Sequence, residues 1–473
     1  MKKGTLSGAL RKGLHERAAW PTQIALWAIG CAAFYALAVN ARYAMIDEFA
    51  AYGVEQMTRV TAGGFTAIFA LSLAVQLRMA KKLPLGAHAL AALITGAVLL
   101  GKISLLDYIS DDYTIFLSDW IYSYSQMGIK EGLGTYIGSD YTPPYLYLML
   151  LVSRAKNFPW QYLVKAVSIA FEVLLAFAVT KLAGLRVKGD GARLAIFHIA
   201  TLLPTVVFNG AYWGQCDVIY ASLCLMALYF ALTQRSALCM TFFGMALSFK
   251  LQTVFFLPAL LPLWLRRDVK LRHLPLIPAA YMAMMLPALW AGKSLHHVLT
   301  VYMAQAGAYN FITVNAPTLW QFLPPLDSKT LYQMFGGMAV AMGMALLSAA
   351  CMLACWKREA LTREGTLLFA LLILGGVPLL LPKMHERYTF GADVLALVIA
   401  CYAPAKGKGA LKLALPLLFG LASYICYTAG LPGEEILPLK WATFAQLLAV
   451  ALTAAALWRS LNSDSVALTE VKA

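Results

Sequence analysis

Long uninterrupted apolar runs constrain this chain more than any other feature. Runs of roughly 15 to 24 residues recur along its whole length, and the composition is 61% hydrophobic and only 13% charged. A helix needs about 20 apolar residues to cross the hydrocarbon core of a bilayer. Lipid offers no hydrogen-bond partners to the backbone, and these runs lack the alternation of barrel strands. We therefore expect an all-α polytopic membrane protein.

The runs predict about fourteen transmembrane helices in one domain, residues 20–458. The expected spans are 22–44, 62–79, 86–108, 160–183, 193–209, 217–233, 236–249, 252–265, 274–292, 333–356, 364–381, 389–404, 411–430 and 438–458. The pair 236–249 and 252–265 is short for two crossings and could instead form a hairpin that reaches part of the way. Residues 143–155 are too few to cross and predict an interfacial or partly dipping helix.

The basic residues predict the orientation of the chain. The formal net charge is +15, from 38 Lys and Arg against 23 Asp and Glu. In so apolar a chain this excess belongs in cytoplasmic loops and against the lipid bilayer, and no nucleic acid is expected as a partner. The expected cytoplasmic segments are the N-terminus 1–19, loops 78–84, 185–193, 233–236, 265–273, 356–365 and 405–412, and the tail 459–473. Two large loops, 109–159 and 293–332, then face the opposite side.

The first of these large loops carries adjacent carboxylates in "SDDYTIFLSDW" (110–120). Neighbouring carboxylates such as Asp111 and Asp112 repel each other, so the pKa of one tends to rise, which suits a general base. A solvated acidic loop is the alternative. Two adjacent carboxylates are also compatible with a divalent metal, but the sequence assigns no metal ligand.

Two further motifs place polar side chains beside apolar helices. In "SDYTPPYLYL" (139–148), Tyr141 could stack on a sugar or sit at the membrane interface. In "NGAYWGQCDVIYA" (209–221), Trp213, Gln215 and Asp217 stand where two apolar helices meet. An ionisable residue at such a junction is a functional candidate, although Asp217 could also cap the helix that follows it.

A lysine stands inside an otherwise apolar stretch, "SFKLQTVFFLP" (248–258). Lys250, with Gln252 two residues later, is costly there unless it meets water, a lipid phosphate or a carboxylate. Snorkelling of its ammonium group to the interface is the alternative.

Charge is densest in "LPKMHERYTF" (381–390). Lys383, His385 and Arg387 are donors suited to a phosphate group, and Glu386 could orient one of them. An interfacial cluster held by its own salt bridge is the alternative. The basic residues of this motif face the side on which basic loops are not expected, which favours a binding role.

Taken in order, these motifs resemble those of polytopic GT-C-fold glycosyltransferases over roughly residues 100 to 400. They are most similar to bacterial relatives of GPI-anchor mannosyltransferases and of dolichol-pathway glucosyltransferases. The resemblance implies transfer of a hexose, mannose or glucose-like, from a polyprenyl-phosphate sugar to a glycan, lipid or protein acceptor. It places the enzyme in the bacterial inner (plasma) membrane, with its site facing the periplasm or the exterior, and implies no nucleotide cofactor.

The resemblance also implies roles for individual residues. Asp112 matches the essential aspartate of the family and would be the general base, while Asp111 stands where the family usually has glycine and leaves the choice between the two open. The implied phosphate-binding residues are Lys250, His385, Arg387 and Lys383. The implied sugar or acceptor contacts are Gln215, Asp217, Tyr113, Trp213, Gln252, Glu386 and Tyr141.

Two other classes of function share these features. A transporter or flippase of lipid-linked sugars also needs charged residues within the membrane and clefts that face lipid. Transporters commonly show repeated halves, whereas the polar motifs here occur once each, which favours an enzyme. A ligase or polymerase of surface polysaccharide would act on the same side with a lipid-diphosphate glycan.

Overall fold

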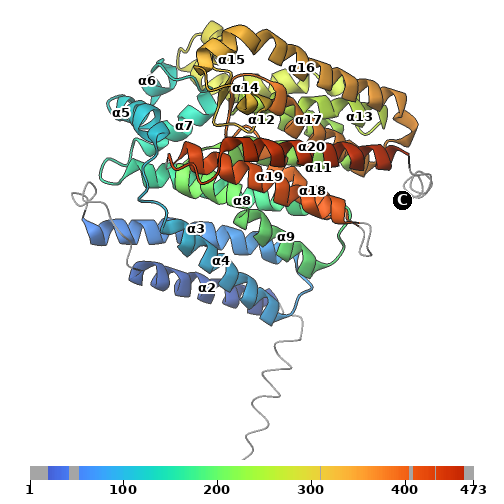
Figure 1. The fold of residues 1–473 in the computed structure, drawn as a ribbon. Helices are drawn as coiled ribbons and strands as arrows, with labels where there is room; N and C mark the ends of the chain where they lie inside the picture. Colours follow the sequence, from blue (N-terminus) through green and yellow to red (C-terminus); the bar gives the residue numbers. More distant parts are fainter. Residues whose placement is uncertain (1–19, 42–52, 309, 404–408, 432, 463–473) are drawn as a thin grey trace, which may run out of the picture.

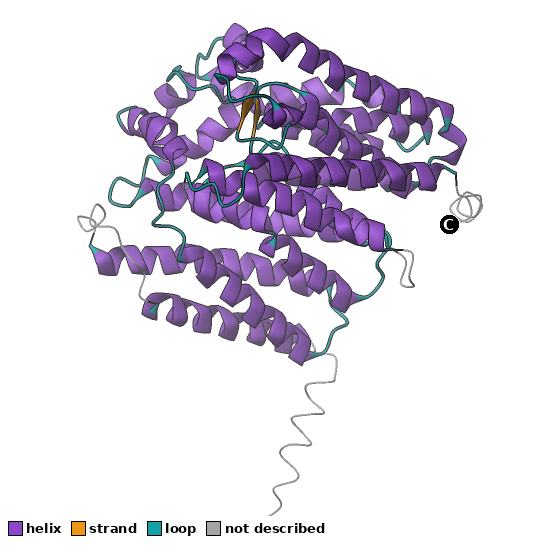
Figure 2. Ribbon diagram, in the orientation of Figure 1, coloured by secondary structure: helices purple, strands orange, loops and turns teal. Residues whose placement is uncertain are grey.

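The computed structural model describes residues 20–41, 53–308, 310–403, 409–431 and 433–462. The chain is 77% helical, which together with its long apolar helices confirms the prediction of an all-α integral membrane protein. Within the described ranges the only strands are β1 (Thr313–Val314) and β2 (Met384–His385), which pair with each other (Figure 2). The predicted cytoplasmic segment 1–19 and most of the tail 459–473 lie outside the described residues.

Long helices run side by side through the molecule (Figure 1). The α-helices are α2 (Trp20–Asn40), α3 (Val54–Met79), α4 (Leu85–Ile103), α5 (Ser118–Ser125), α6 (Ile129–Gly134), α7 (Pro143–Val152), α8 (Trp160–Ala183), α9 (Asp190–Leu202), α10 (Pro204–Val207), α11 (Asp217–Leu232), α12 (Ser236–Leu247), α13 (Leu260–Leu265), α14 (Leu276–Trp290), α15 (Leu295–Ala308), α16 (Ser328–Trp356), α17 (Arg363–Leu380), α18 (Phe390–Ala400), α19 (Ala410–Gly430) and α20 (Leu439–Leu461).

Nine of the described helices are long and apolar enough to cross a membrane. A tenth candidate is α9 together with Pro204–Trp213, a pair bent by 52°. The other four predicted spans hold shorter apolar helices, in α11, α12, Leu251–Leu265 and α18. The count of fourteen crossings therefore stays a prediction. The segment 143–155 forms the short helix α7.

The centre of the bundle is formed by helices that are apolar on every side. Nearly every residue of α11, α17 and α18 is buried, as expected for helices that pack against protein all around rather than facing lipid. By contrast, α2 is largely exposed and lies at the edge of the bundle (Figure 1). The helices α2, α3 and α4 thus form an outer group that precedes the first predicted external loop.

The connections between the long helices segregate to two ends of the bundle (Figure 1). The connections after α3, α8 and α16 lie at the end where α20 also finishes, whereas α5, α6 and α7 lie at the other end. This separation is the one that the distribution of basic residues predicts. Which end faces the cytoplasm stays a prediction.

A buried ion pair joins the outer helices to the rest of the bundle. The Lys102 ammonium on α4 pairs with the Glu172 carboxylate on α8, and each side chain is only 3% exposed. Beside this pair, Gln76 donates to the Thr95 hydroxyl at 2.9 Å, and that hydroxyl lies 3.1 Å from the His198 ring. Charges so deeply buried are tolerated in an apolar bundle because they are paired.

Removing one partner of this ion pair is expected to destabilise the protein strongly. Lys102→Met leaves the Glu172 charge buried and unpaired, which typically costs about 3 to 5 kcal/mol. The double variant Lys102→Met with Glu172→Leu should recover much of that loss, while Lys82→Met, at an exposed lysine, should change little. The free energy of unfolding in mixed micelles, followed by circular dichroism, measures these differences. A Lys102→Met variant as stable as the Lys82→Met control would contradict the role of the pair.

Candidate functional site

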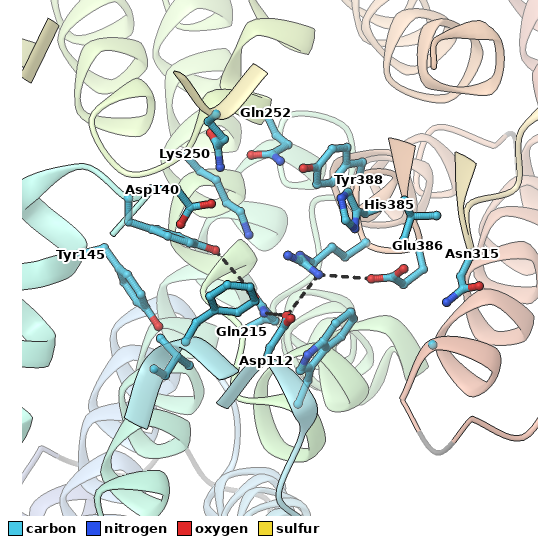
Figure 3. A pocket seen from close by; sticks show the side chains of 18 of the residues that line it. Asp112, Asp140, Tyr145, Gln215, Lys250, Gln252, Asn315, His385, Glu386 and Tyr388 are labelled. Atoms are coloured by element: carbon cyan, nitrogen blue, oxygen red, sulfur yellow. Dashed lines mark hydrogen bonds and ion pairs between the residues drawn. The ribbon is translucent and has the colours of Figure 1, made fainter. Parts of the chain in front are cut away.

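A polar cavity of about 260 Å³ lies where several distant segments of the chain meet (Figure 3). Most of the lining comes from the segment after α4, the residues around the start of α7, the junction before α11, the turn after α12 and the loop before α18. Single residues of α15 and α19, and the end of β1 with Asn315, complete it. Nine of the residues expected in the site line this cavity: Asp112, Tyr141, Trp213, Gln215, Lys250, Gln252, His385, Glu386 and Arg387. Folding therefore brings together most of the polar motifs that the sequence sets far apart.

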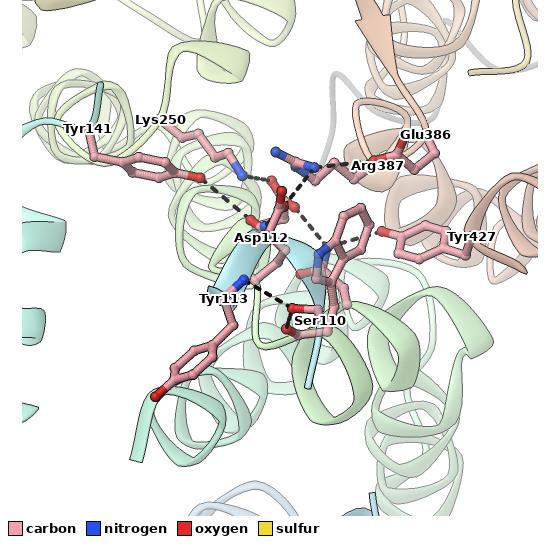
Figure 4. Close-up of polar contacts among 12 residues, drawn as sticks. Ser110, Asp112, Tyr113, Tyr141, Lys250, Glu386, Arg387 and Tyr427 are labelled. Carbon is pink, nitrogen blue, oxygen red and sulfur yellow. Dashed lines mark hydrogen bonds and ion pairs between the residues drawn. The ribbon is translucent and has the colours of Figure 1, made fainter. Parts of the chain in front are cut away.

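Asp112 owes its position to a fixed turn at the start of a π-helix. The π-helix Tyr113–Leu117 follows it directly, and the Tyr113 amide donates to the Ser110 carbonyl at 3.0 Å. The Ser110 hydroxyl in turn donates to the Trp213 carbonyl at 3.1 Å (Figure 4). Wider π turns are rare and occur often at functional sites. Here the turn anchors the carboxylate segment to the 209–217 junction.

Gln215 is aimed at Asp112 by a glycine that ends a second π-helix, Phe208–Trp213. Gly214 has φ of 83°, a left-handed conformation that glycine adopts without a steric cost. The turn is closed by the Gln215 amide, which donates to the Asn209 carbonyl at 2.8 Å. The side-chain amide of Gln215 then donates to Asp112 Oδ2 at 2.5 Å. One face of the carboxylate is thereby fixed.

Arg387 holds the same carboxylate from the opposite loop. Its Nη1 lies 3.3 Å from Asp112 Oδ2 and 3.2 Å from Glu386 Oε1 (Figure 4). Its guanidinium also lies over the Trp213 ring, 4.8 Å from the ring centre. The Arg387 side chain is 14% exposed and that of Asp112 is 26% exposed, so the pair is only partly shielded from the cavity. A guanidinium is thus held at the wall with the candidate base beside it.

Lys250 is placed at the cavity by a carboxylate behind it. Its Nζ lies 2.5 Å from Asp217 Oδ1 and 5.7 Å from the centre of the Tyr141 ring. Asp217 Oδ2 accepts from the Asn209 amide at 2.7 Å, and that amide also donates to the Tyr427 hydroxyl at 3.0 Å. Asp217 is fully buried and does not line the cavity. Its position favours orienting Lys250 over contacting a sugar, and it also opens α11.

The two-stranded sheet joins the second large loop to the charged loop. Thr313 pairs with Met384 and Val314 with His385 in parallel register, and Asn315 forms a further bridge to His385. This pairing brings Asn315 to the cavity wall opposite Lys250 (Figure 3). No pattern in the sequence predicted these two short strands.

Burial sets the charge state of the loop residues. Burial, aided by Arg387 and Lys250, lowers the pKa of His385 to about 3, so the imidazole is neutral at physiological pH. It can donate a hydrogen bond to a phosphate but contributes no positive charge. Burial likewise raises the pKa of Glu386 to about 7 against the opposing effect of Arg387, and raises the pKa of Asp140. The cationic groups that line the cavity are Lys250 and Arg387.

Besides Asp217, three of the expected site residues lie outside the cavity lining. Asp111 is exposed and outside the cavity lining, and the ring of Tyr113 points away from the Asp112 cluster (Figure 4). Lys383 lines a neighbouring cavity, where its Nζ donates to the Ala306 carbonyl at 2.8 Å. A phosphate seated between Lys250 and Arg387 would therefore not be contacted by Lys383 in this arrangement.

Other lining residues were not singled out from the sequence. They include Asp140, Tyr145, Gln305, Asn315 and Tyr388. Asp140 directly precedes Tyr141 in the "SDYTPP" motif, so its charge was the available signal. Gln305 and Asn315 belong to a long segment without a recognisable motif, and only the fold brings them to the site.

The neighbouring cavity, of about 350 Å³, has mainly apolar walls. It shares Gln252, Gln305, His385 and Tyr388 with the polar cavity. Its other lining residues are Leu251, Val254, Phe255, Ala306, Tyr332, Val340, Leu381, Pro382, Lys383 and Met384. The side-chain oxygens of Gln252 and Gln305 are buried without a hydrogen-bond partner among the described residues. Unpartnered polar atoms at a shared wall are suited to a ligand that extends through both cavities.

The fold and the site together define a helical integral membrane protein with a polar cavity that adjoins an apolar one. Within the ranges that the structure covers, no group of three or more His, Cys, Asp or Glu side chains is arranged to hold a metal ion. A scan against protein-family models finds no match to the chain, and a search of curated proteins finds no similar sequence.

The raised pKa of Glu386 predicts a pH-dependent stability. Between about pH 4.5 and 7 the folded protein binds more protons at this group than the unfolded chain does, so its contribution to stability is full below this range and is lost as the pH rises through it. Relative to Glu386→Gln, the wild type should lose on the order of 3 kcal/mol across the range. Unfolding in mixed micelles at several pH values measures this loss. The exposed Glu434→Gln is the control and should follow the wild type. If the free energies of unfolding of the wild type and Glu386→Gln changed in parallel with pH, the raised pKa of Glu386 would be contradicted.

Proposed function

We propose that this protein is a GT-C-like membrane glycosyltransferase that transfers a hexose, mannose or glucose-like, from a polyprenyl-phosphate sugar to a glycan, lipid or protein acceptor. The observation that carries the proposal is the adjacency of the two cavities. One offers three acidic side chains, two cations and aromatic rings, and the walls of the other are mainly apolar. A lipid-linked sugar has the same two-part character, with a polar head and a long hydrocarbon chain.

In the proposed reaction Asp112 is the general base. Its carboxylate accepts the proton of the acceptor hydroxyl while that oxygen forms a bond to the anomeric carbon. The bond between the anomeric carbon and the phosphate oxygen breaks, and the polyprenyl phosphate leaves with the bonding electron pair. Gln215 and Arg387 orient the carboxylate. Asp111 is exposed and away from the cavity, which favours Asp112 as the base.

Two cations would stabilise the leaving phosphate. Lys250 and Arg387 line the same cavity, and Arg387 Nε has no hydrogen-bond partner among the described residues, so a donor remains for the phosphate. Charge-assisted hydrogen bonds from such groups strengthen as negative charge develops on the leaving oxygen. His385 would add a neutral hydrogen bond. Tyr141, Trp213 and other aromatic rings of the wall are suited to stack on sugar faces.

The apolar cavity would receive the first units of the polyprenyl chain. Its walls come from the Leu251–Phe255 turn, from α16 and from the loop before α18. Lys383 borders this cavity, with its ammonium 5.1 Å from the centre of the Tyr332 ring.

A transporter of lipid-linked sugars would use the same two cavities and is the alternative function. A polysaccharide ligase or polymerase would need room for a diphosphate.

The proposed setting is the bacterial inner membrane, crossed about fourteen times, with the site facing the periplasm. The basic loops after α3, α8 and α16 lie at the opposite end of the bundle from α5, α6 and α7 (Figure 1), and α5 and α7 contribute residues to the site. Positive loops remain on the cytoplasmic side, so this separation supports a periplasmic site.

Replacing Asp112 by asparagine should remove sugar transfer without unfolding the protein. The substitution keeps size and one acceptor but removes the base, so we expect kcat to fall at least about 100-fold. Asp111→Asn, which makes the same change at an exposed neighbour, should retain most activity. Mass spectrometry of products formed from a panel of synthetic polyprenyl-phosphate hexoses measures transfer. Normal turnover by Asp112→Asn would exclude it as the base. Passage of the intact lipid across liposomes without transfer would favour the transporter.

The proposed orientation predicts which introduced cysteines are accessible from outside. In a variant without the eight native cysteines, Tyr136→Cys near the site should react with a membrane-impermeant maleimide on intact spheroplasts. Lys188→Cys, exposed at the other end, should react only after permeabilisation. The opposite labelling pattern would place the site in the cytoplasm and remove the support that orientation gives to the proposed function.

A further inference from the structure

A second polar cavity lies at the end of the bundle opposite the Asp112 site. Its volume is about 370 Å³, and it is lined by the ends of α3, α8 and α11 and by the beginning of α9. Helix α8 connects the two regions. Gln161, near its start, donates to the Leu106 carbonyl ahead of Asp112, whereas Thr180 and Lys181 line the second cavity near its end. At 1.5 Å per residue the two are separated by roughly 30 Å, about the thickness of the hydrocarbon core.

The second cavity carries an excess of positive charge. Arg78, Lys81, Lys181 and Arg193 all line it and come from α3, the turn after α3, α8 and α9. Over the residues that the structure covers, only Arg193 has a carboxylate partner, Asp190 at 3.4 Å. Charges of one sign collected from separate elements repel each other unless an anion lies between them. The cluster is therefore suited to a phosphate group.

Two features of α8 point to a ligand independently of the charge count. The Lys181 ammonium lies 5.6 Å from the centre of the Phe177 ring and 5.4 Å from that of Tyr229. These contacts hold it in place without neutralising its charge. The neighbouring Thr180 is only 1% exposed, and its hydroxyl has no hydrogen-bond partner in the described part of the chain. A buried hydroxyl without a partner at a cavity wall lacks an interaction that a bound molecule would supply.

We propose that this cavity binds the phosphate of an anionic phospholipid headgroup. Of the helices around it, α3 and α8 are candidate membrane spans and α9 is part of a bent candidate span, so the cations stand at headgroup level. Met79, Phe177 and Leu185 supply apolar edges suited to the glycerol and the first methylene groups of the lipid. A free phosphate compound would use the same cations. Bound in this way, the phosphate bridges α3 of the outer group to α8 and α9. Its negative charge offsets the repulsion between the cationic side chains of these helices.

Lipid binding by charge variants tests this proposal. The protein is purified in neutral detergent, and retention of added phosphatidylglycerol is titrated by native mass spectrometry, with phosphatidylcholine as the neutral lipid. The double variant Lys181→Gln with Arg193→Gln should bind phosphatidylglycerol at least tenfold more weakly than wild type. The double variant Arg186→Gln with Lys188→Gln removes two charges from the exposed adjoining loop, outside the cavity lining, and should stay within about twofold of wild type.

Further variants and a second ligand distinguish a lipid site from a site for a free phosphate compound and from the absence of a site. Lys181→Arg with Arg193→Lys keeps both charges and should keep binding, whereas Thr180→Val should weaken it severalfold. Inorganic phosphate, followed by thermal shift, should not stabilise the wild type at millimolar concentration. Stabilisation by phosphate that is lost in the Gln double variant, with no preference for phosphatidylglycerol, would overturn the lipid assignment in favour of a free phosphate compound. Equal lipid retention by both Gln double variants, or equal loss in the charge-conserving variant, would overturn the site itself. None of these measurements needs the sugar donor.

Discussion

A charge buried in an apolar bundle must find a partner, and the arrangement of the polar cavity follows from this constraint. Lys250 is stabilised from behind by Asp217, which is buried and fixed by Asn209. Arg387 is stabilised from the side by Glu386 and by Asp112 itself. Each cation thus has a buried carboxylate as a partner, whereas Asp112, which is 26% exposed, and Asp140 are the carboxylates partly open to the cavity. The buried Asp217 and Glu386 hold the charges in place, while Asp112 pairs with Arg387 and is still exposed enough to meet an acceptor.

The same constraint explains why much of the site could be predicted from the sequence. Asp112, Lys250 and Arg387 interrupt or border apolar runs, and such residues are rarely retained without a partner or a function. Periodicity and run length likewise predicted each of the nine described helices that are long enough to cross a membrane, but not α15, which lies in the predicted external loop 293–332. These signals are local, because they depend only on a charged residue and its immediate neighbours in the chain.

Features that depend on distant segments could not be predicted in this way. The pairing of Thr313–Val314 with Met384–His385 joins segments about 70 residues apart, and it decides that Asn315 and His385 face the cavity. Lys383 shows the converse. It belongs to the same charged motif as His385 and Arg387, yet its left-handed backbone, with φ of 62°, and its bond to Ala306 direct it to the apolar cavity. The density of charge in the sequence identified the loop before α18 as part of a site. Only the fold shows which of its charged residues line the polar cavity and which lines the apolar one.

Buried polar side chains along helix α8 bind several separate parts of the bundle. Near its start, Lys165 donates to the Leu105 and Tyr108 carbonyls at 2.8 and 2.7 Å, and Gln161 donates to the Leu106 carbonyl at 2.6 Å. The carbonyl groups of the segment that leads to Asp112 are thereby bonded to α8. At the middle of the helix, Glu172 binds the outer group through α4. A displacement of α8 along its axis would move the carbonyls that precede Asp112, so interactions that hold α8 against α3, α4 and α9 also bear on the position of the candidate base.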